Sequence, residues 1–332
     1  MPFRPARSAR RTLSLVLLAA ALAGGCALRG APAPGAKAGE AAAPAAPAHV
    51  ADGGLLSYYD TITGGREGTA LTGVAEVRLR RPVAVAVRDQ DIYIADADAE
   101  RVYHYDPFTR QLDLVVDLHG QIGGDPAALY VAADRSIWLT DTFGARVLHF
   151  SRKGKLVQVL ENALNLARPV GVSVNDANGD VYVADGLMDQ VLVFNREGKL
   201  WRSIAGRGTN PGELLNTTAM ARDSDGIYLT ARLGVRGQVL NEGGEPLHVF
   251  ESGTLVFPTG VAVDAERRVY VSDSFDNTIK IYQDGKLIAR QGMTGVAPGR
   301  YKGLAGLCVS GPMLYVADSL NSRVQIMRIG AP

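Results

Sequence analysis

The histidines and cysteines that could act as general acids or bases, as nucleophiles or as metal ligands are few in this sequence. Neither a Ser-His-Asp order nor a Cys-His pairing is evident, so a hydrolytic triad or a thiol nucleophile is not expected. Residues 176–180 (DANGD) resemble part of a calcium loop but lack its distal glutamate, which favours a simple turn. The remaining candidates are five histidines, at His49, His104, His119, His149 and His248, and two cysteines, at Cys26 and Cys308.

Aspartates, in contrast, recur at a regular spacing of about 45 residues. Each closes an apolar stretch, and a polar residue follows five positions later. Because a group present in nearly every repeat more often stabilises the repeat than binds a ligand, we interpret these carboxylates as structural: each accepts loop N–H groups and pairs with the polar residue. The marker aspartates are Asp96, Asp141, Asp185, Asp273 and Asp318, with Ala231 in the fourth slot. The polar residues are Arg101, Arg146, Gln190, Thr278 and Arg323, with Gln238 two positions late in the fourth repeat.

Six copies of one strand–turn–strand–loop–strand pattern must position these residues. Residues 83–87, 170–174 and 261–263 are apolar at consecutive rather than alternating positions, so both faces of these strands should be buried. Radially stacked antiparallel blades bury strands in this way, because each blade packs between two neighbours. The sequence therefore predicts an all-β fold, a six-bladed β-propeller. The last repeat stops after its third strand, so residues 55–62 should complete that blade and close the ring; the alternative is an N-terminal strand outside the ring.

The repeat resembles the NHL repeat. Its skeleton is Pro-x-Gly-Val-Ala-Val-Asp, then Val-Tyr-Val-Ala-Asp-Ser, then Arg-Val-x-x-Phe, and residues 168–194 and 257–282 match it most closely. The Gly-rich segments 205–212 and 292–299 also look like those that precede NHL repeats. The resemblance covers roughly residues 55–329 and implies a six-bladed propeller. It implies no single function, because NHL relatives bind protein, RNA or small ligands, and a few are enzymes.

Propeller lyases similar to the NHL family use several histidines at the channel, a metal, or both. Here only His119 could approach the channel mouth, because the other four histidines fall in the N-terminal segment, on third strands or on an outer strand. Cys308 falls within an innermost apolar strand, where an inert core thiol is expected. We therefore expect no catalytic residue, no metal site and no cofactor. A metal-dependent lyase or hydrolase with its site at the central channel is the alternative.

Loops between second and third strands should gather on one face, around the mouth of the channel. Two positions after the marker the residue is large and apolar in five of six repeats, which favours a recognition surface for a protein or an anionic glycan. Alternatively, each side chain tucks under its own loop. The fourth loop, residues 230–236, looks longer and carries two arginines, indicating a specialised sector or repeat decay. The predicted binding rim comprises Phe143, Leu187, Met188, Leu233, Phe275, Leu320, Arg81, Arg168, Arg232, Arg236 and Lys302, with Asp98 and Asp125 beside them.

The first 25 residues have the features of a bacterial signal peptide. Four arginines precede an apolar run, residues 13–23, that is too short to span a bilayer. Residues 22–26 (LAGGC) resemble a lipobox, which would make Cys26 a lipidated N-terminus, although Leu22 stands one position further upstream than is usual. An ordinary cleaved signal is the alternative. Residues 26–49 are rich in Ala, Pro and Gly and indicate a tether, which leaves residues 50–332 for the propeller.

Removal of the signal peptide would take away four arginines and no acid, changing the net charge from +1 to about −3. No basic block remains, so no nucleic-acid partner is expected. In bacterial lipoproteins, a residue other than Asp after the lipidated cysteine is typical of the outer membrane. Ala27 therefore favours the outer membrane of the cell envelope, on its periplasmic or surface face. We thus expect a monomer that contacts the membrane through Cys26.

Overall fold

The computed structural model describes residues 54–69, 73–162 and 164–330. The predicted signal peptide (1–25), Cys26 and the predicted tether (26–49) lie outside these residues. The described part is built from β-strands and one short 3-10 helix, η1 (Ser319–Asn321). No helix within these ranges is long and apolar enough to cross a membrane.

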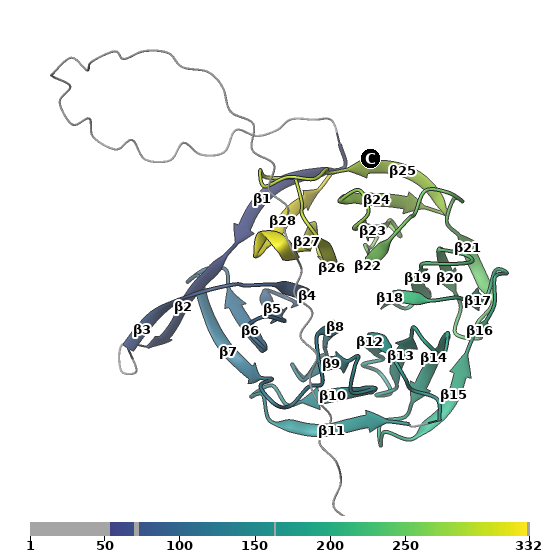
Figure 1. Ribbon diagram of the computed structural model, residues 1–332, viewed down its shortest axis with the longest axis horizontal. Coiled ribbons are helices and arrows are strands. Elements are labelled where there is room, and N and C mark those ends of the chain that lie inside the picture. The colour runs from purple at the N-terminus through teal and green to yellow at the C-terminus, as the bar shows by residue number, and fades with distance from the viewer. Residues whose placement is uncertain (1–53, 70–72, 163, 331–332) are drawn as a thin grey trace, which may run out of the picture. The chain divides into compact units, whose positions relative to one another are not determined.

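Six antiparallel blades stand around a common axis, with the first strand of each blade innermost (Figure 1). This arrangement confirms the predicted six-bladed β-propeller. The innermost strands are β4 (Pro82–Arg88), β8 (Pro126–Val131), β12 (Pro169–Val174), β18 (Thr217–Arg222), β22 (Pro258–Val263) and β26 (Leu304–Ser310). The second strands are β5 (Asp91–Asp96), β9 (Ile137–Asp141), β13 (Val181–Asp185), β19 (Ile227–Ala231), β23 (Val269–Asp273) and β27 (Met313–Asp318).

The third and fourth strands complete each blade toward the outside of the ring. The third strands are β6 (Arg101–Asp106), β10 (Arg146–Phe150), β14 (Gln190–Phe194), β20 (Gly237–Leu240), β24 (Thr278–Gln283) and β28 (Arg323–Ile329). The outer strands are β7 (Gln111–Asp117), β11 (Leu156–Glu161), β15 (Leu200–Ile204), β21 (Pro246–Val249), β25 (Lys286–Gln291) and β1 (Leu56–Ile62).

The core is divided among the interfaces between neighbouring blades. A separate apolar cluster fills each of the six interfaces, including the one between the last and first blades, whose cluster contains Ile326 and Tyr103. Four of the second strands, β9, β13, β19 and β23, are buried at every position. Consecutive apolar residues are therefore required, because both faces of these strands are covered by a neighbouring sheet.

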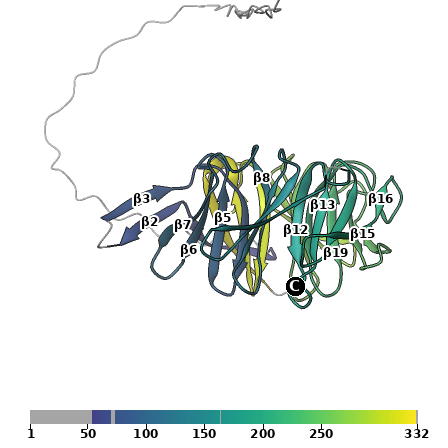
Figure 2. The same cartoon turned by 90° about the horizontal axis from the view of Figure 1, so that it is seen from below.

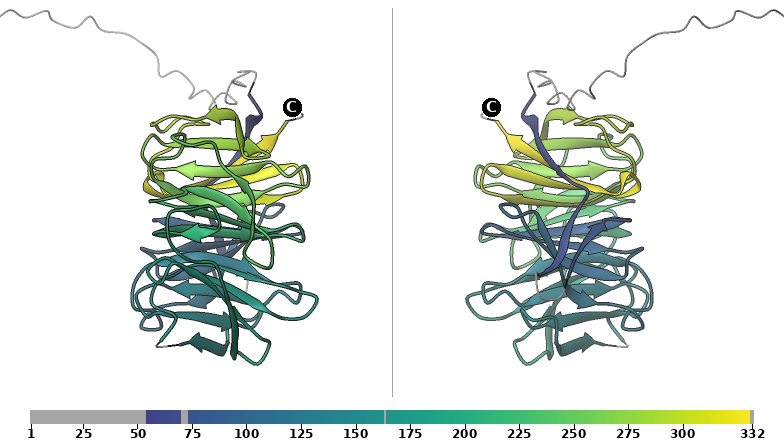
Figure 3. Two further views of the ribbon diagram at one scale, coloured as in Figure 1. Left: turned by 90° about the vertical axis from the view of Figure 1, so that its right-hand side faces the viewer. Right: turned by 90° about the vertical axis from the view of Figure 1, so that its left-hand side faces the viewer.

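The ring closes through the N-terminal strand, as predicted. Strand β1 pairs antiparallel with β28, from Leu56 opposite Ile329 to Ile62 opposite Val324. Figure 3 shows β1 running alongside the yellow C-terminal strand. The Gly330 N–H donates to the Leu55 carbonyl at 2.7 Å and continues the pairing beyond the strand.

Two pairs of strands were not predicted. A hairpin of β2 (Gly64–Thr69) and β3 (Gly73–Arg78) joins the outer edge of the first blade, where β2 runs parallel to β7, and it projects from the side of the ring (Figure 2). A short parallel pair, β16 (Gly206–Arg207) and β17 (Glu213–Leu214), forms within the Gly-rich segment before the fourth blade.

Candidate functional site: the loop rim

The marker aspartates hold two loops of each blade together. All five are fully buried and close their second strands. One oxygen of Asp185 accepts the Ala167 and Arg168 N–H groups at 2.6 and 2.7 Å, from the segment that enters the innermost strand. The other accepts the Leu187 and Met188 N–H groups at 2.8 and 2.7 Å, from the loop to the third strand. These carboxylates thus fix the loops of one face of the ring.

The residues that bond to the marker aspartates differ in part from the predicted ones, which lie five positions further along the chain. Arg146 and Arg323, five positions on, donate Nε to their markers at 2.9 and 2.6 Å. The corresponding residues of two other blades bond elsewhere: Gln190 donates to the Asn165 carbonyl, and Thr278 donates to Asp276. In the first blade, the Nε–H of Arg101 is buried without a hydrogen-bond partner. The expected pairing is therefore wrong for these blades. In the blade of Thr278, the residue at the seventh position after the marker, Lys280, reaches the carboxylate instead.

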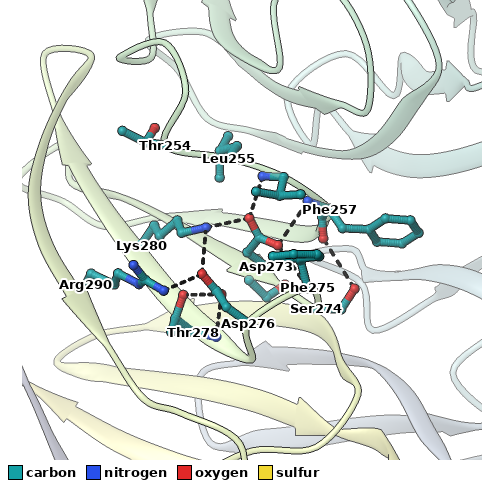
Figure 4. Close-up of polar contacts among 12 residues, drawn as sticks. Thr254, Leu255, Phe257, Asp273, Ser274, Phe275, Asp276, Thr278, Lys280 and Arg290 are labelled. Carbon is teal, nitrogen blue, oxygen red and sulfur yellow. Dashed lines mark hydrogen bonds and ion pairs between the residues drawn. The ribbon is translucent and has the colours of Figure 1, made fainter.

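Lys280 and Gln325 occupy that seventh position in the last two blades. Lys280 Nζ lies 2.5 Å from Asp273, and both side chains are buried (Figure 4). Burial alone would raise the pKa of Asp273, but the hydrogen bond from Lys280 and those from the Val256 and Phe257 N–H groups outweigh it and lower the pKa. Gln325 Nε2 donates to Asp318 at 3.0 Å in the same manner.

The fourth blade follows the same register without the carboxylate. Thr230 pairs with Gly237, which places Arg236, not Gln238, at the fifth position after Ala231. The fourth loop is therefore not longer than the others, and that expectation is wrong. Its turn differs, because the left-handed residue is Gly234, one position earlier than in the other five loops. Arg236 donates Nη1 to the Leu255 carbonyl at 2.6 Å, and Gln238 bonds to residues of the preceding Gly-rich segment.

We call the six loops from second to third strand, with the residue just before each innermost strand, the loop rim. Hydrogen bonds such as Gly186 N–H to the Arg168 carbonyl at 2.8 Å and Ser274 N–H to the Phe257 carbonyl at 3.0 Å place these segments side by side. The predicted apolar residues of the rim are 40–76% exposed: Phe143, Leu187, Met188, Leu233, Phe275 and Leu320. Phe143 and Leu320 lie against Gly124 and Gly303 at their bases, yet both remain more than half exposed.

The cations of the rim have different surroundings. Arg81 forms two ion pairs, with Asp98 at 2.6 Å and with Asp125 at 2.8 Å. Arg232 stacks on the Phe257 ring at 3.5 Å.

Lys302 is exposed, but it lies one residue before the rim position, which Gly303 occupies in the sixth blade. Phe257 and Asn216 occupy this position in the fifth and fourth blades and were overlooked, although alignment on the strand register would have found them.

The central channel holds a cavity toward the face away from the rim. This cavity of about 220 Å³ is lined by residues from all six innermost strands. Its two arginines are paired, Arg88 with Asp176 at 2.9 Å and Arg222 with Glu242 at 2.6 Å. Cys308 also lines this cavity, and burial raises the pKa of its thiol to about 11. The thiol is therefore protonated at neutral pH, which makes it a weak nucleophile.

The histidines of the propeller lie in separate places. His104, His119 and His248 each face an aspartate, and His149 stacks on Trp138 with ring centroids 3.8 Å apart. His149 and Trp138 line a groove of about 580 Å³, and a separate cavity of about 480 Å³ lies beside Arg236. Burial lowers the pKa of His149. Within residues 54–69, 73–162 and 164–330, no three His, Cys, Asp or Glu side chains are grouped so that they could hold a metal ion.

Comparison with known proteins agrees with the fold. No family model matches the sequence. Over 128 residues, 37% of this chain, the sequence is 30% identical to the brain tumor protein of Drosophila melanogaster, and the match spans 12% of that protein's length.

Among solved structures, virginiamycin B lyase from Staphylococcus aureus superposes with a TM-score of 0.56 at 12% identity, covering 75% of this chain and 94% of the lyase. A protein of unknown function from Bacteroides thetaiotaomicron gives 0.60 at 16% identity, covering 81% and 75%. A chain of a nidogen/laminin complex gives 0.57 at 18% identity, covering 73% and 90%.

Replacing Lys280 with methionine tests how the loops are held. Removing one partner of a buried ion pair leaves Asp273 uncompensated, so we expect Lys280→Met to lower the free energy of unfolding by about 3–5 kcal/mol at pH 7. Since folding lowers the pKa of Asp273, its contribution is fully present above the unfolded value of about 4 and is lost as the pH falls below that value toward the lowered pKa of the folded protein. The difference between wild type and variant in denaturant titrations should therefore shrink in acid. The exposed Lys286→Met is the control, and equal losses in the two variants would contradict the assignment.

The strand order and the six interface clusters establish the architecture, and the solved structures above are similar to it: the chain is a six-bladed β-propeller.

Proposed function

We propose that this propeller is a non-enzymatic binding or scaffold module that contacts a protein or glycan partner through its loop rim. The observation that carries the proposal is the exposure of one or more large apolar side chains in five of the six rim loops. Large apolar side chains gathered on one surface are typical of recognition sites, because their burial on binding contributes about 1.5–3 kcal/mol each.

The rigidity of the rim supports this role. Each rim loop except the fourth is bonded to a fully buried carboxylate, so the loops are ordered before a partner arrives. A pre-ordered surface loses little conformational entropy on binding, which leaves more of the contact energy as affinity.

Serine substitutions in the rim test the proposal. We expect Phe143→Ser and Phe275→Ser to abolish capture of the partner from cell-envelope extracts and to change the Tm by only a few degrees, because both side chains are at least 70% exposed. Phe108→Ser is the matched control: Phe108 is 79% exposed in the turn after β6, at the end of that strand opposite the rim. Unchanged capture by the rim variants would refute the proposal, and a large fall in Tm would identify the two residues as packing residues.

We also propose that the propeller is held at the bacterial cell envelope by lipid on Cys26, with residues 26–49 as the tether. The support is the sequence alone: a basic segment, a short apolar run and a lipobox-like stretch ending at Cys26. Diacylation would give stable membrane attachment, whereas a single chain is marginal.

Cys26→Ser tests this anchoring directly. The wild-type chain, expressed in a Gram-negative host, should incorporate radiolabelled palmitate and partition into the detergent phase of Triton X-114, and the variant should do neither. Cys308→Ser should label like wild type. A wild-type protein that is processed but unlabelled would instead indicate an ordinary cleaved signal.

A further inference from the structure

Two arginines occupy the same place in two blades. Arg81 and Arg168 each precede the proline that opens an innermost strand, Pro82 and Pro169. The carbonyl of each arginine accepts the N–H of the residue after the marker aspartate, at 2.9 Å in the first blade and 2.8 Å in the third. Their side chains therefore start from equivalent backbone positions on the rim.

The neighbours of these arginines differ in charge. Arg81 lies between Asp98, in its own blade, and Asp125, which precedes the next innermost strand. The residues at these two places around Arg168 are Leu187 and Asn216. Arg168 Nη2 donates to Asn216 Oδ1 at 2.7 Å, as Arg81 Nη2 donates to Asp125 Oδ1 at 2.8 Å, so the geometry is kept while both carboxylates are absent. The same Nη2 also donates to the Gly186 carbonyl, which is a neutral acceptor.

A second cation adds to the uncompensated charge. Arg232 lies over the Phe257 ring, and burial together with the charge of Arg168 lowers its pKa. Across the described ranges, neither Arg168 nor Arg232 forms an ion pair. The Arg168 Nε–H is buried without a hydrogen-bond partner. Two neighbouring like charges without an acid destabilise each other, and a bound anion would remove that cost.

We infer that this sector of the rim binds an acidic polypeptide segment, with a carboxylate between Arg168 and Arg232 and apolar side chains against Leu187, Leu233 and Phe275. The inference rests on the proposed function and names the chemistry of its partner. Guanidinium groups form directional, charge-assisted hydrogen bonds with carboxylates, which gives the site direction as well as charge. Leucines supply no hydrogen bonds for sugar hydroxyls, so the apolar flank favours a polypeptide over a glycan.

The rest of the rim restricts where such a segment can lie. The first two blades present Asp98 and Asp125, which already neutralise Arg81 and would repel a further carboxylate. The acidic residues of the partner should therefore lie over the third and fourth blades, with its apolar residues continuing toward the fifth.

The binding experiment uses a short fluorescein-labelled peptide of alternating Glu and Leu, and the same peptide with Gln in place of Glu. By fluorescence anisotropy at low salt, the full-length propeller should prefer the Glu peptide about tenfold or more. Arg168→Gln and Arg232→Gln should each remove most of that preference and flatten its salt dependence. Arg152→Gln removes the same charge at the far end of β10, away from the rim, and should bind like wild type.

A gain-of-function variant provides the complementary test. Asp98→Leu combined with Asp125→Asn copies the surroundings of Arg168 onto Arg81 and should tighten binding of the Glu peptide. Equal binding of the Glu and Gln peptides by wild type, or unchanged affinity in Arg168→Gln and Arg232→Gln, would overturn the inference. So would a uronate oligosaccharide that binds more tightly than the Glu peptide.

Phe275→Ser separates this inference from the proposed function. If Phe275→Ser weakens peptide binding while both arginine variants bind like wild type, the rim is a binding surface but its charge does not select the partner. If none of these variants changes binding, both the rim function and the inference fail.

Discussion

Burial of both faces of every blade is the constraint on which the rest of this structure depends. A sheet whose second strand is buried at every position, such as β13 or β23, needs a neighbour on each side. Six such blades meet this need only by closing into a ring, because an open stack would expose two apolar faces. The pairing of β1 with β28 completes the sixth blade, and Ile62 of β1 is buried in the cluster between the last and first blades.

Closure of the ring brings equivalent loops to one face, and the buried carboxylates then fix their conformation. The marker aspartates act in the same way in five blades, yet their neighbours on the rim vary freely, since the side chains there contact solvent. A repeated scaffold can therefore carry a surface that is not symmetric. The contrast between Arg81, flanked by two carboxylates, and Arg168, flanked by Leu187 and Asn216, is the clearest instance.

The sequence predicted the fold almost completely, because its signal is repeated six times. Consecutive apolar residues, the marker spacing and the short last repeat together indicated the blade number and the closing strand. The hairpin of β2 and β3 was not found, since it occurs once and β3 is almost entirely exposed. The partners of the markers were only partly predicted. Which of the fifth and seventh positions reaches the carboxylate depends on side-chain length and packing, as Lys280 shows.

The sequence predicted which positions form the candidate site, but not which neighbours surround each side chain there. An alignment of the repeats identifies the position two residues after each marker aspartate. It does not show whether a side chain there, such as Phe143 or Leu187, is exposed, because exposure depends on how the neighbouring loop packs. The charge balance around Arg168 required the strand register, because Asn216 lies in another blade, 48 residues away in the chain. The register of β19 with β20 also showed that the fourth loop is not longer than the others.

Hydrogen–deuterium exchange of the backbone amides of β1 and β28 tests the closed ring most directly. If β1 completes the last blade, the amides of Leu56–Ile62 that face β28 should be protected to about the same degree as those of Arg323–Ile329, and both should exchange together as denaturant is added. Rapid exchange throughout β1 while β28 remains protected would show that the ring is not closed by this strand, and the account of the rim built on that ring would have to be abandoned.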